Sequence, residues 1–331
     1  MSLRVPRGAT PADVWGYPDR RLTRFPVLRR MCWSGADGDA SFTPTTATTY
    51  RFPKPLMFYR NLVIGPRATL MPPIGARVQI LCVSNTLQLD GTIDVSGCGG
   101  PGGTNPGGGG AGGAGGGGII IIARKIVGSG RVLANGLNGG NGSYVGDSAG
   151  GSGGSGVYRS ISIPGGSGVP AYRIGGGGGG AGVWGSGGPG GTGGGPGGIN
   201  PKEARFLDVS TDLIFDGYAG GGGAGGAYGG VAGGGGGGGG GLIVIISENP
   251  IPGITLQAKG GNGGIGTGGS YAGGGGGGGG GLIIIVAPGD NSIKSVDGGA
   301  GGAGGGASGS AGSTGEPGLV SFIPAYPHEV I

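Results

Sequence analysis

Two runs of nine consecutive glycines, at residues 233–241 and 273–281, limit what this chain can fold into. Glycine loses more backbone freedom on ordering than any other residue, so an ordered run needs strong compensating contacts. The main-chain N–H and C=O groups are the only groups available to make them, and buried ones must be paired. The runs therefore predict either closely packed main chains or unstructured linkers.

The residues that follow the glycine runs favour packed main chains. Each run leads directly into an aliphatic cluster, Leu242–Ile246 in one case and Leu282–Val286 in the other. A looser glycine run at 107–118 leads into Ile119–Ile122 in the same way. Exposed aliphatic clusters promote aggregation, which argues that these clusters are buried. They do not alternate with polar residues, so we expect short strands with both faces buried.

The glycine runs are expected to pack as closely as the chains of collagen do, but with glycine needed at all three positions of each turn instead of one. In a three-residue helix without internal hydrogen bonds, the polar groups point outward, and neighbouring chains can bond one another only where no Cβ intervenes. Collagen itself is excluded because the 101 glycines come in blocks rather than as Gly-X-Y, and there are only 23 prolines. The predicted fold class is all-β or irregular. Short strands in a β-sandwich or solenoid-like layer combine with a bundle of polyglycine II helices and little or no α-helix.

Composition divides the chain into three parts. Residues 1–55 are a basic N-terminal arm, since residues 1–60 carry ten basic and four acidic side chains and the rest carries eleven and twelve. Residues 56–97 form a neck of short strands at 62–64, 78–83, 86–89 and 92–95, with a tight turn at Asp90-Gly91. Residues 98–331 are the glycine-rich body, interrupted by inserted loops at 137–232.

Several kinds of chemistry are disfavoured. The three cysteines, Cys32, Cys82 and Cys98, lack metal-ligand spacing, and their odd number argues against a disulfide framework. The presence of a single histidine, His328, argues against a catalytic triad and against a histidine metal site. We therefore expect no enzyme, no cofactor and no metal. The basic charge lies in the arm rather than on a folded face, which argues against nucleic acid as a partner. No aliphatic run is long enough for membrane insertion, and no signal peptide is visible.

Two groups of residues are candidates for binding. Loops rich in tyrosine, serine and glycine suit adaptable recognition, although these rings can equally pack over glycine backbone. The candidate receptor-binding residues are Tyr144, Tyr158, Arg159, Tyr172, Arg173, Trp184, Tyr218 and Tyr228. The candidate particle-attachment residues of the arm are Trp15, Tyr17, Arg20, Arg21, Arg24, Arg29, Arg30 and Trp33.

The sequence resembles glycine-rich phage tail proteins. The likeness rests on the segment 86–97, on the glycine blocks with their aliphatic clusters, and on the arm segment 13–23, which is similar to segments of fibre and fibre-attachment proteins. The blocks resemble the tip adhesins of T-even-like long tail fibres, whose polyglycine II bundles display receptor-binding loops. The aliphatic clusters depart from those adhesins.

The resemblance implies a tail-fibre or tail-tip protein of the virion, made in the host cytoplasm. Its partners would be other tail proteins, through the arm, and a host surface receptor or glycan. Fibres are often trimers whereas tip adhesins can be single copies, so a homotrimer stays open. The alternative is a purely structural virion or cell-surface protein without a specific ligand. A third hypothesis, an ice- or polysaccharide-binding module, needs a flat threonine-rich face, and the body has few threonines.

Overall fold

The computed structural model describes residues 34–99, 102, 110–143, 153–158, 161–165, 227–228, 231–268, 272–306 and 309–324. Within these residues the protein is all-β, with two large parallel sheets and no helix. Two small antiparallel pairs accompany them, β9 (Gly153–Tyr158) with β10 (Ile161–Gly165), and β11 (Ala227–Tyr228) with β12 (Val231–Ala232). The all-β prediction is thus confirmed for the described part of the chain.

The larger sheet has seven parallel strands. In spatial order they are β1 (Gly38–Phe42), β3 (Leu56–Ile64), β5 (Val78–Leu89), β7 (Gly118–Val127), β13 (Leu242–Ser247), β15 (Leu282–Ala287) and β17 (Leu319–Pro324). The second sheet has six parallel strands. These are β2 (Thr48–Arg51), β4 (Ala68–Met71), β6 (Thr92–Asp94), β8 (Arg131–Leu133), β14 (Thr255–Gln257) and β16 (Ile293–Ser295).

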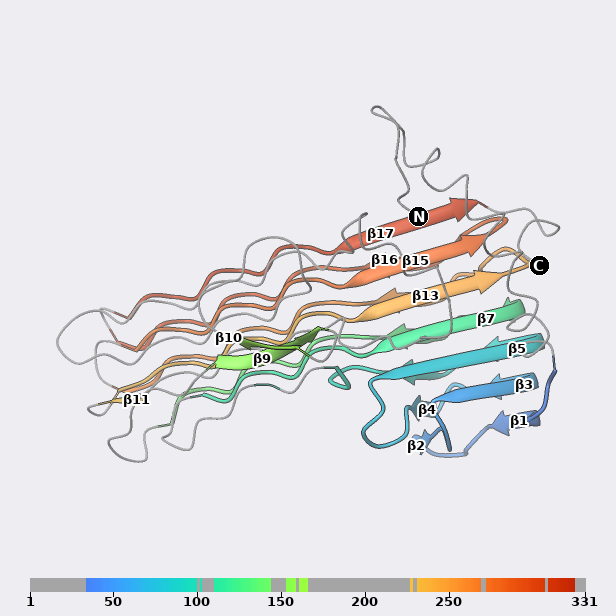
Figure 1. Cartoon of the computed structure of the whole chain (residues 1–331), viewed down its shortest axis with the longest axis horizontal. Coiled ribbons are helices and arrows are strands. Elements are labelled where there is room, and N and C mark those ends of the chain that lie inside the picture. Colours follow the sequence, from blue (N-terminus) through green and yellow to red (C-terminus); the bar gives the residue numbers. More distant parts are fainter. Residues whose placement is uncertain are drawn as a thin grey trace, which may run out of the picture.

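Successive strands alternate between the two sheets, and each strand lies beside the one two steps earlier in its own sheet. Figure 1 shows the result as a stack that rises in chain order from β1 and β2 to β17. The corners between the sheets are stacked as well. Gly91 N–H donates to Ile64 O over 2.9 Å, and Gly130 N–H donates to Leu89 O over 2.8 Å. Successive levels are therefore tied together at the strands and at the corners.

The hydrophobic core lies between the two sheets. One row across the larger sheet consists of Leu81, Ile121, Ile245 and Ile285, which are paired in register and fully buried. Neighbouring residues that point to the other face are also largely buried, with Ile120 only 7% exposed. The absence of alternation in the aliphatic clusters correctly predicted strands buried on both faces.

The Asp90-Gly91 turn joins two sheets rather than two paired strands. β5 and β6 lie in different sheets, and both make only parallel pairs. A hairpin would need antiparallel neighbours. Glycine is required here because a Cβ on Gly91 would lie 2.3 Å from Gly65 O and 2.4 Å from Ala68 O, in the corner below.

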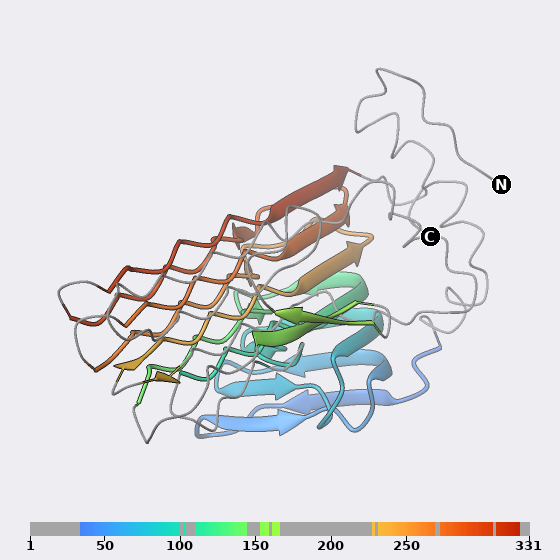
Figure 2. The same cartoon turned by 60° about the vertical axis from the view of Figure 1, so that its left-hand side comes forward.

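The glycine-rich segments extend from the sheets in two directions. Segments that leave the six-stranded sheet, here called outbound segments, span residues 134–143, 258–268 and 296–306. Segments that enter the seven-stranded sheet, the inbound segments, span 110–117, 233–241, 272–281 and 309–318. In Figures 1 and 2 these segments run side by side away from the strands that they join.

Hydrogen bonds between the segments recur at every third residue. Gly234, Gly237 and Gly240 donate to Gly273, Gly276 and Gly279 of the next inbound segment over 2.8–2.9 Å. Gly235, Gly238 and Gly241 donate instead to an outbound segment, at Gly140, Leu137 and Ala134. The same residues also accept bonds from other segments: Gly264 N–H donates to Gly235 O, and Gly261 N–H to Gly238 O. Each inbound segment is thus bonded to several neighbours at once.

The spaces between segments are too small for a side chain. A Cβ on Gly235 would lie 2.0 Å from Ala111 O, and a Cβ on Gly237 would lie 1.9 Å from Gly261 O. Separations below 3.0 Å are essentially never seen for real Cβ atoms, and the obstructing atoms here are main chain. The prediction of main chains packed without intervening side chains describes these segments well.

The structure describes only part of the arm and of the inserted loops that composition predicted, and it describes the whole neck. Of the arm 1–55, residues 34–55 are described, and they contribute β1 and β2 to the two sheets. The neck strands β3 to β6 are continuous with the glycine-rich body, because β5 pairs with β7 and β6 pairs with β8. Of the inserted loops 137–232, residues 137–143 belong to an outbound segment.

Candidate functional surface

Two regular polar surfaces stand out among the described residues. One, here called the outer row, consists of every third residue of the outbound segments. Its members are Asn135, Asn138, Asn141, Lys259, Asn262, Ile265, Asp297, Ala300 and Ala303. The other, here called the strand ladder, crosses the first strands of the seven-stranded sheet. Its members are Asp39, Arg60, Asn61 and Asn85.

The asparagines of the outer row hold neighbouring segments together. Asn138 Oδ1 accepts a hydrogen bond of 2.8 Å from the main-chain N–H of Asn262, and Asn262 Oδ1 accepts one of 2.9 Å from Ala300 N–H. Asn135 Oδ1 does the same for Lys259 N–H over 2.8 Å. A side chain here replaces a missing main-chain acceptor, which explains why asparagine recurs in this register.

Charge is concentrated at the end of the outer row nearest the sheets. Lys259 Nζ lies 3.4 Å from Asp297 Oδ2, and both side chains are exposed. The Ser295 hydroxyl also donates to Asp297, and these hydrogen bonds lower the pKa of that carboxyl. Further along, Asn138 and Asn262 are exposed beside Ala300. The outer row therefore changes from an ion pair to amides and then to apolar side chains at Ile265 and Ala303.

The strand ladder forms where three neighbouring strands change register. The register shifts lie between Gly38 and Ala40 in β1, Tyr59 and Asn61 in β3, and Val83 and Thr86 in β5. Bulges of this kind re-aim side chains.

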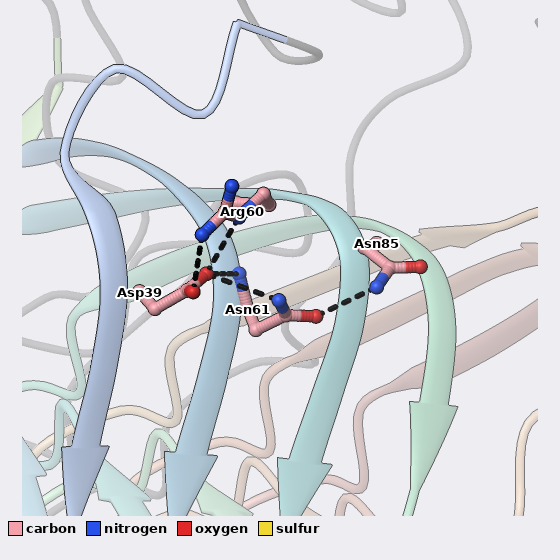
Figure 3. A network of polar contacts seen from close by, with 4 residues as sticks. All are labelled: Asp39, Arg60, Asn61 and Asn85. Carbon is pink, nitrogen blue, oxygen red and sulfur yellow. Dashed lines mark hydrogen bonds and ion pairs between the residues drawn. The ribbon is translucent and has the colours of Figure 1, made fainter.

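Figure 3 shows the contacts of the strand ladder. Arg60 donates to both carboxylate oxygens of Asp39, Asn61 donates to Asp39 from its main-chain and side-chain nitrogens, and Asn85 donates to Asn61 Oδ1 over 2.8 Å. Hydrogen bonds from Arg60 and Asn61 lower the pKa of Asp39 to about 2.

Polar contacts continue across the same sheet beyond the strand ladder. Arg124 of β7 forms an ion pair with Glu248, with Nε 3.2 Å from Oε2, and its carbonyl accepts a 2.9 Å hydrogen bond from Asn249 Nδ2. At the first strands, Asp37 binds Lys54 Nζ at 2.8 Å and accepts the Phe58 N–H. Burial opposes ionisation of Asp37, but these two contacts outweigh it and lower its pKa.

Most of the residues proposed from sequence as binding residues lie outside the described part of the chain. This holds for Tyr144, Arg159, Tyr172, Arg173, Trp184 and Tyr218, and for all attachment candidates, which are Trp15, Tyr17, Arg20, Arg21, Arg24, Arg29, Arg30 and Trp33. The backbone of Tyr158 closes β9 and that of Tyr228 closes β11. Each tyrosine is the last residue of its strand before the antiparallel partner begins.

The described cysteines show no catalytic activation. Cys82 is fully buried, and Cys98 is half-buried with its pKa raised by burial and by the nearby Asp94 carboxylate. Among the described residues, no group of three or more His, Cys, Asp or Glu side chains is arranged to hold a metal ion. The described part of the chain also contains no apolar helix of membrane-spanning length.

Sequence reasoning missed both polar surfaces. The outer row carries a readable signal, because asparagine recurs at Asn135, Asn138 and Asn141 with a spacing of three. The strand ladder has no such signal, since its residues are 21 to 24 positions apart and meet only through strand pairing. No protein-family model matches the chain, and comparisons with curated proteins and with solved structures also gave no match.

Proposed function

We propose that the chain is a structural subunit of a bacteriophage tail fibre or tail tip. In this proposal the alternating strands form a β-solenoid, and the glycine-rich segments form a bundle of polyglycine II helices. The observation that carries it is the period of three in the hydrogen bonds between main chains that leave no room for a Cβ. A binding or catalytic domain has no need of so much bare backbone, whereas a stiff spacer does.

The directions of the hydrogen bonds support polyglycine II helices. A helix with three residues per turn presents its N–H and C=O groups in three directions around its axis. In the run 233–241, Gly234 donates to one neighbour, Gly235 donates to a second, and Gly233 accepts from Gly110 of a third. At a rise of about 3.1 Å per residue, nine residues span roughly 28 Å.

The distal part of such a scaffold is suited to recognition. The chain between the outbound segment 134–143 and the inbound segment 233–241 contains the tyrosine, tryptophan and arginine residues proposed for receptor binding. Loops that carry function are commonly supported by a rigid framework. In this proposal Tyr158, Tyr172 and Trp184 contact a host surface receptor or glycan, and the basic arm attaches to other tail proteins.

One observation favours the alternative, a structural protein without a specific ligand. The outer-row asparagines use their Oδ1 atoms for bonds within the molecule, as Asn138 does with Asn262 and Asn262 does with Ala300. Stabilisation of the scaffold is therefore sufficient to explain why asparagine occupies these positions. The alternative and the fibre proposal share the scaffold and differ only in whether the inserted loops bind.

Two experiments test the proposal in steps. Electron microscopy of particles that carry a labelled C-terminus should place the label on the tail; a label elsewhere on the particle contradicts the assignment to the tail. For the loops, the purified protein should bind host cells, and changing Tyr158, Tyr172 and Trp184 to alanine should abolish binding. An exposed scaffold change, Ala300→Ser, is the matched control and should leave binding intact. Equal binding by both variants would contradict the role of these three residues, and no binding by the unchanged protein would favour the ligand-free alternative.

A further inference from the structure

Every asparagine that precedes a glycine in this chain lies in the outer row. The pairs are Asn135-Gly136, Asn138-Gly139, Asn141-Gly142 and Asn262-Gly263. The remaining asparagines of the sequence precede leucine, threonine, serine or proline. The Asn-Gly pair is thus confined to one register of the outbound segments.

Each Asn-Gly pair binds both main-chain groups of a single residue in the next outbound segment. Asn141 Oδ1 accepts the N–H of Ile265 over 2.9 Å, and Gly142 N–H donates to Ile265 O, also over 2.9 Å. The other three pairs bind Lys259, Asn262 and Ala300 in the same way, over 2.7–2.9 Å. This two-bond arrangement is here called the Asn-Gly clamp.

The packing of the segments favours both residues of the clamp. The asparagine supplies an acceptor that the main chain lacks at this point, and the glycine leaves room for a neighbouring main chain. A Cβ on Gly142 would lie 2.4 Å from Ala232 O, and a Cβ on Gly263 would lie 1.9 Å from Gly275 O. The fold therefore requires a chemically labile dipeptide at each of these positions.

The lability of an Asn-Gly pair comes from the absence of a Cβ on the glycine, which leaves ring closure unhindered. In deamidation the main-chain nitrogen of the glycine attacks Cγ of the asparagine and loses its proton, and the side-chain amide leaves as ammonia. The product is a succinimide ring. Water then opens the ring at one carbonyl or the other and gives aspartate or isoaspartate. In isoaspartate the main chain runs through the former side chain and is longer by one methylene group.

The clamp occupies both groups that this reaction needs. At Asn141, ring closure would break the bond from Gly142 N–H to Ile265 O and would pull Oδ1 away from the N–H of Ile265. The next outbound segment must therefore separate before the ring can form. Water already reaches the site, because the side chains of Asn138, Asn141 and Asn262 are exposed.

We propose that the Asn-Gly pairs of the outer row are modification sites that the clamp keeps unreactive, and that opening of an outbound segment converts them to isoaspartate. The added methylene group shifts the glycines that follow out of their three-residue period. The clamp then has no geometry in which to re-form. Deamidation thus makes a transient opening of the glycine-rich segments permanent.

The first test compares deamidation in the folded and the unfolded chain. The full chain is incubated in a mildly alkaline buffer, with or without enough urea to unfold it, and each Asn-Gly peptide is followed by mass spectrometry. We expect each pair to react roughly thirtyfold or more slowly in the folded chain, because opening breaks both hydrogen bonds of the clamp. Equal rates in the two states, or no reaction in the unfolded chain, would overturn the proposal.

A substitution in the neighbouring segment tests the clamp itself. Ile265→Pro removes the N–H that binds Asn141 and keeps the carbonyl that binds Gly142, and proline suits an extended three-residue helix. In the folded variant Asn141 should deamidate about fivefold faster, because one hydrogen bond is lost, while Asn135 and Asn138 keep their rates. Ile265→Ala keeps the N–H and is the matched control, with every rate unchanged. An unchanged rate at Asn141 in Ile265→Pro, or an equal rise at all three asparagines, would contradict control by the clamp.

The last test asks whether the modification holds the segment open. Chains with isoaspartate at position 141 carry an added negative charge and can be isolated by ion exchange. In this fraction the Ile265 amide should exchange its hydrogen about fivefold or more faster than in the unmodified chain, because its acceptor has moved. The Lys259 amide, which Asn135 binds, should be equally protected in both fractions and reports that the fold is intact. Equal protection of Ile265 in both fractions would show that the clamp re-forms, against the proposal.

Discussion

The replacement of Gly238 by alanine is the sharpest test of how the glycine-rich segments are packed. Gly238 lies in the middle of an inbound segment, where its N–H donates to Leu137 O over 2.9 Å. A Cβ at this position would lie 2.1 Å from Ala114 O, whereas ordinary contact begins at 3.4 Å. The segment 110–117 would therefore have to move away by more than 1 Å.

The cost follows from the bonds that such a movement breaks. The segment 110–117 is held to the run 233–241 near this point by Gly113 N–H to Gly236 O and Gly116 N–H to Gly239 O, both 2.8 Å. Two lost hydrogen bonds cost about 2 kcal/mol, and overpacking costs about 1–3 kcal/mol. Alanine recovers up to about 1 kcal/mol by restricting the unfolded chain. We expect the free energy of unfolding to fall by about 3 kcal/mol.

Urea titration of purified variants measures this free energy, and the chain offers two matched controls. Gly253→Ala adds the same methyl group where nothing lies within 4 Å and should stay within about 0.5 kcal/mol of the wild type. Ala114 occupies the register position of Gly238 in the first inbound segment and is only half-buried, so Ala114→Gly should be similarly mild. If Gly238→Ala is no less stable than Gly253→Ala, the close packing inferred here is wrong.

Three further changes test the polar contacts. The pKa of Asp39 is about 2 in the folded protein and 3.8 ordinarily, so the contribution of its carboxylate to stability is complete above pH 4 and is lost as the pH falls toward 2. In acid titrations monitored by circular dichroism, Asp39→Asn should lose that part of the pH dependence of stability, and an unchanged profile would contradict the pKa assignment. Asn138→Ala should cost about 1 kcal/mol and accelerate hydrogen exchange at the Asn262 amide, which loses its acceptor; unchanged exchange there would exclude the bond. Because burial and Asp94 raise the pKa of Cys98, its thiol should stay protonated at neutral pH and react with iodoacetamide more slowly than a free peptide thiol; equal rates would show an open site.

The sequence predicted those parts of the fold that depend on local pattern. The aliphatic clusters after each glycine run became strands buried on both faces, because a run such as Leu242–Ile246 has no polar residue to point toward water. The glycine runs were predicted to pack without side chains between them, because no other contact could compensate their loss of entropy.

What depended on long-range pairing could not be predicted. The Asp90-Gly91 turn has the same local chemistry in a hairpin and in a corner between sheets, and only the parallel pairing of β5 with β7 distinguishes them. The strand ladder likewise requires Asp39, Arg60 and Asn85 to meet across three strands. The asparagines of the outer row were readable in principle from their spacing, but that spacing has meaning only once the three-residue period of the segments is known.

A run of nine identical glycines has no side chain that distinguishes one register with a neighbouring run from another. A slip of three residues between 233–241 and 273–281 would preserve the period of their hydrogen bonds, so the glycines alone cannot determine how the segments line up. The alignment is determined where the runs end, at the pairing of Leu242 with Leu282. It follows that the aliphatic strands set the register of the glycine segments that precede them.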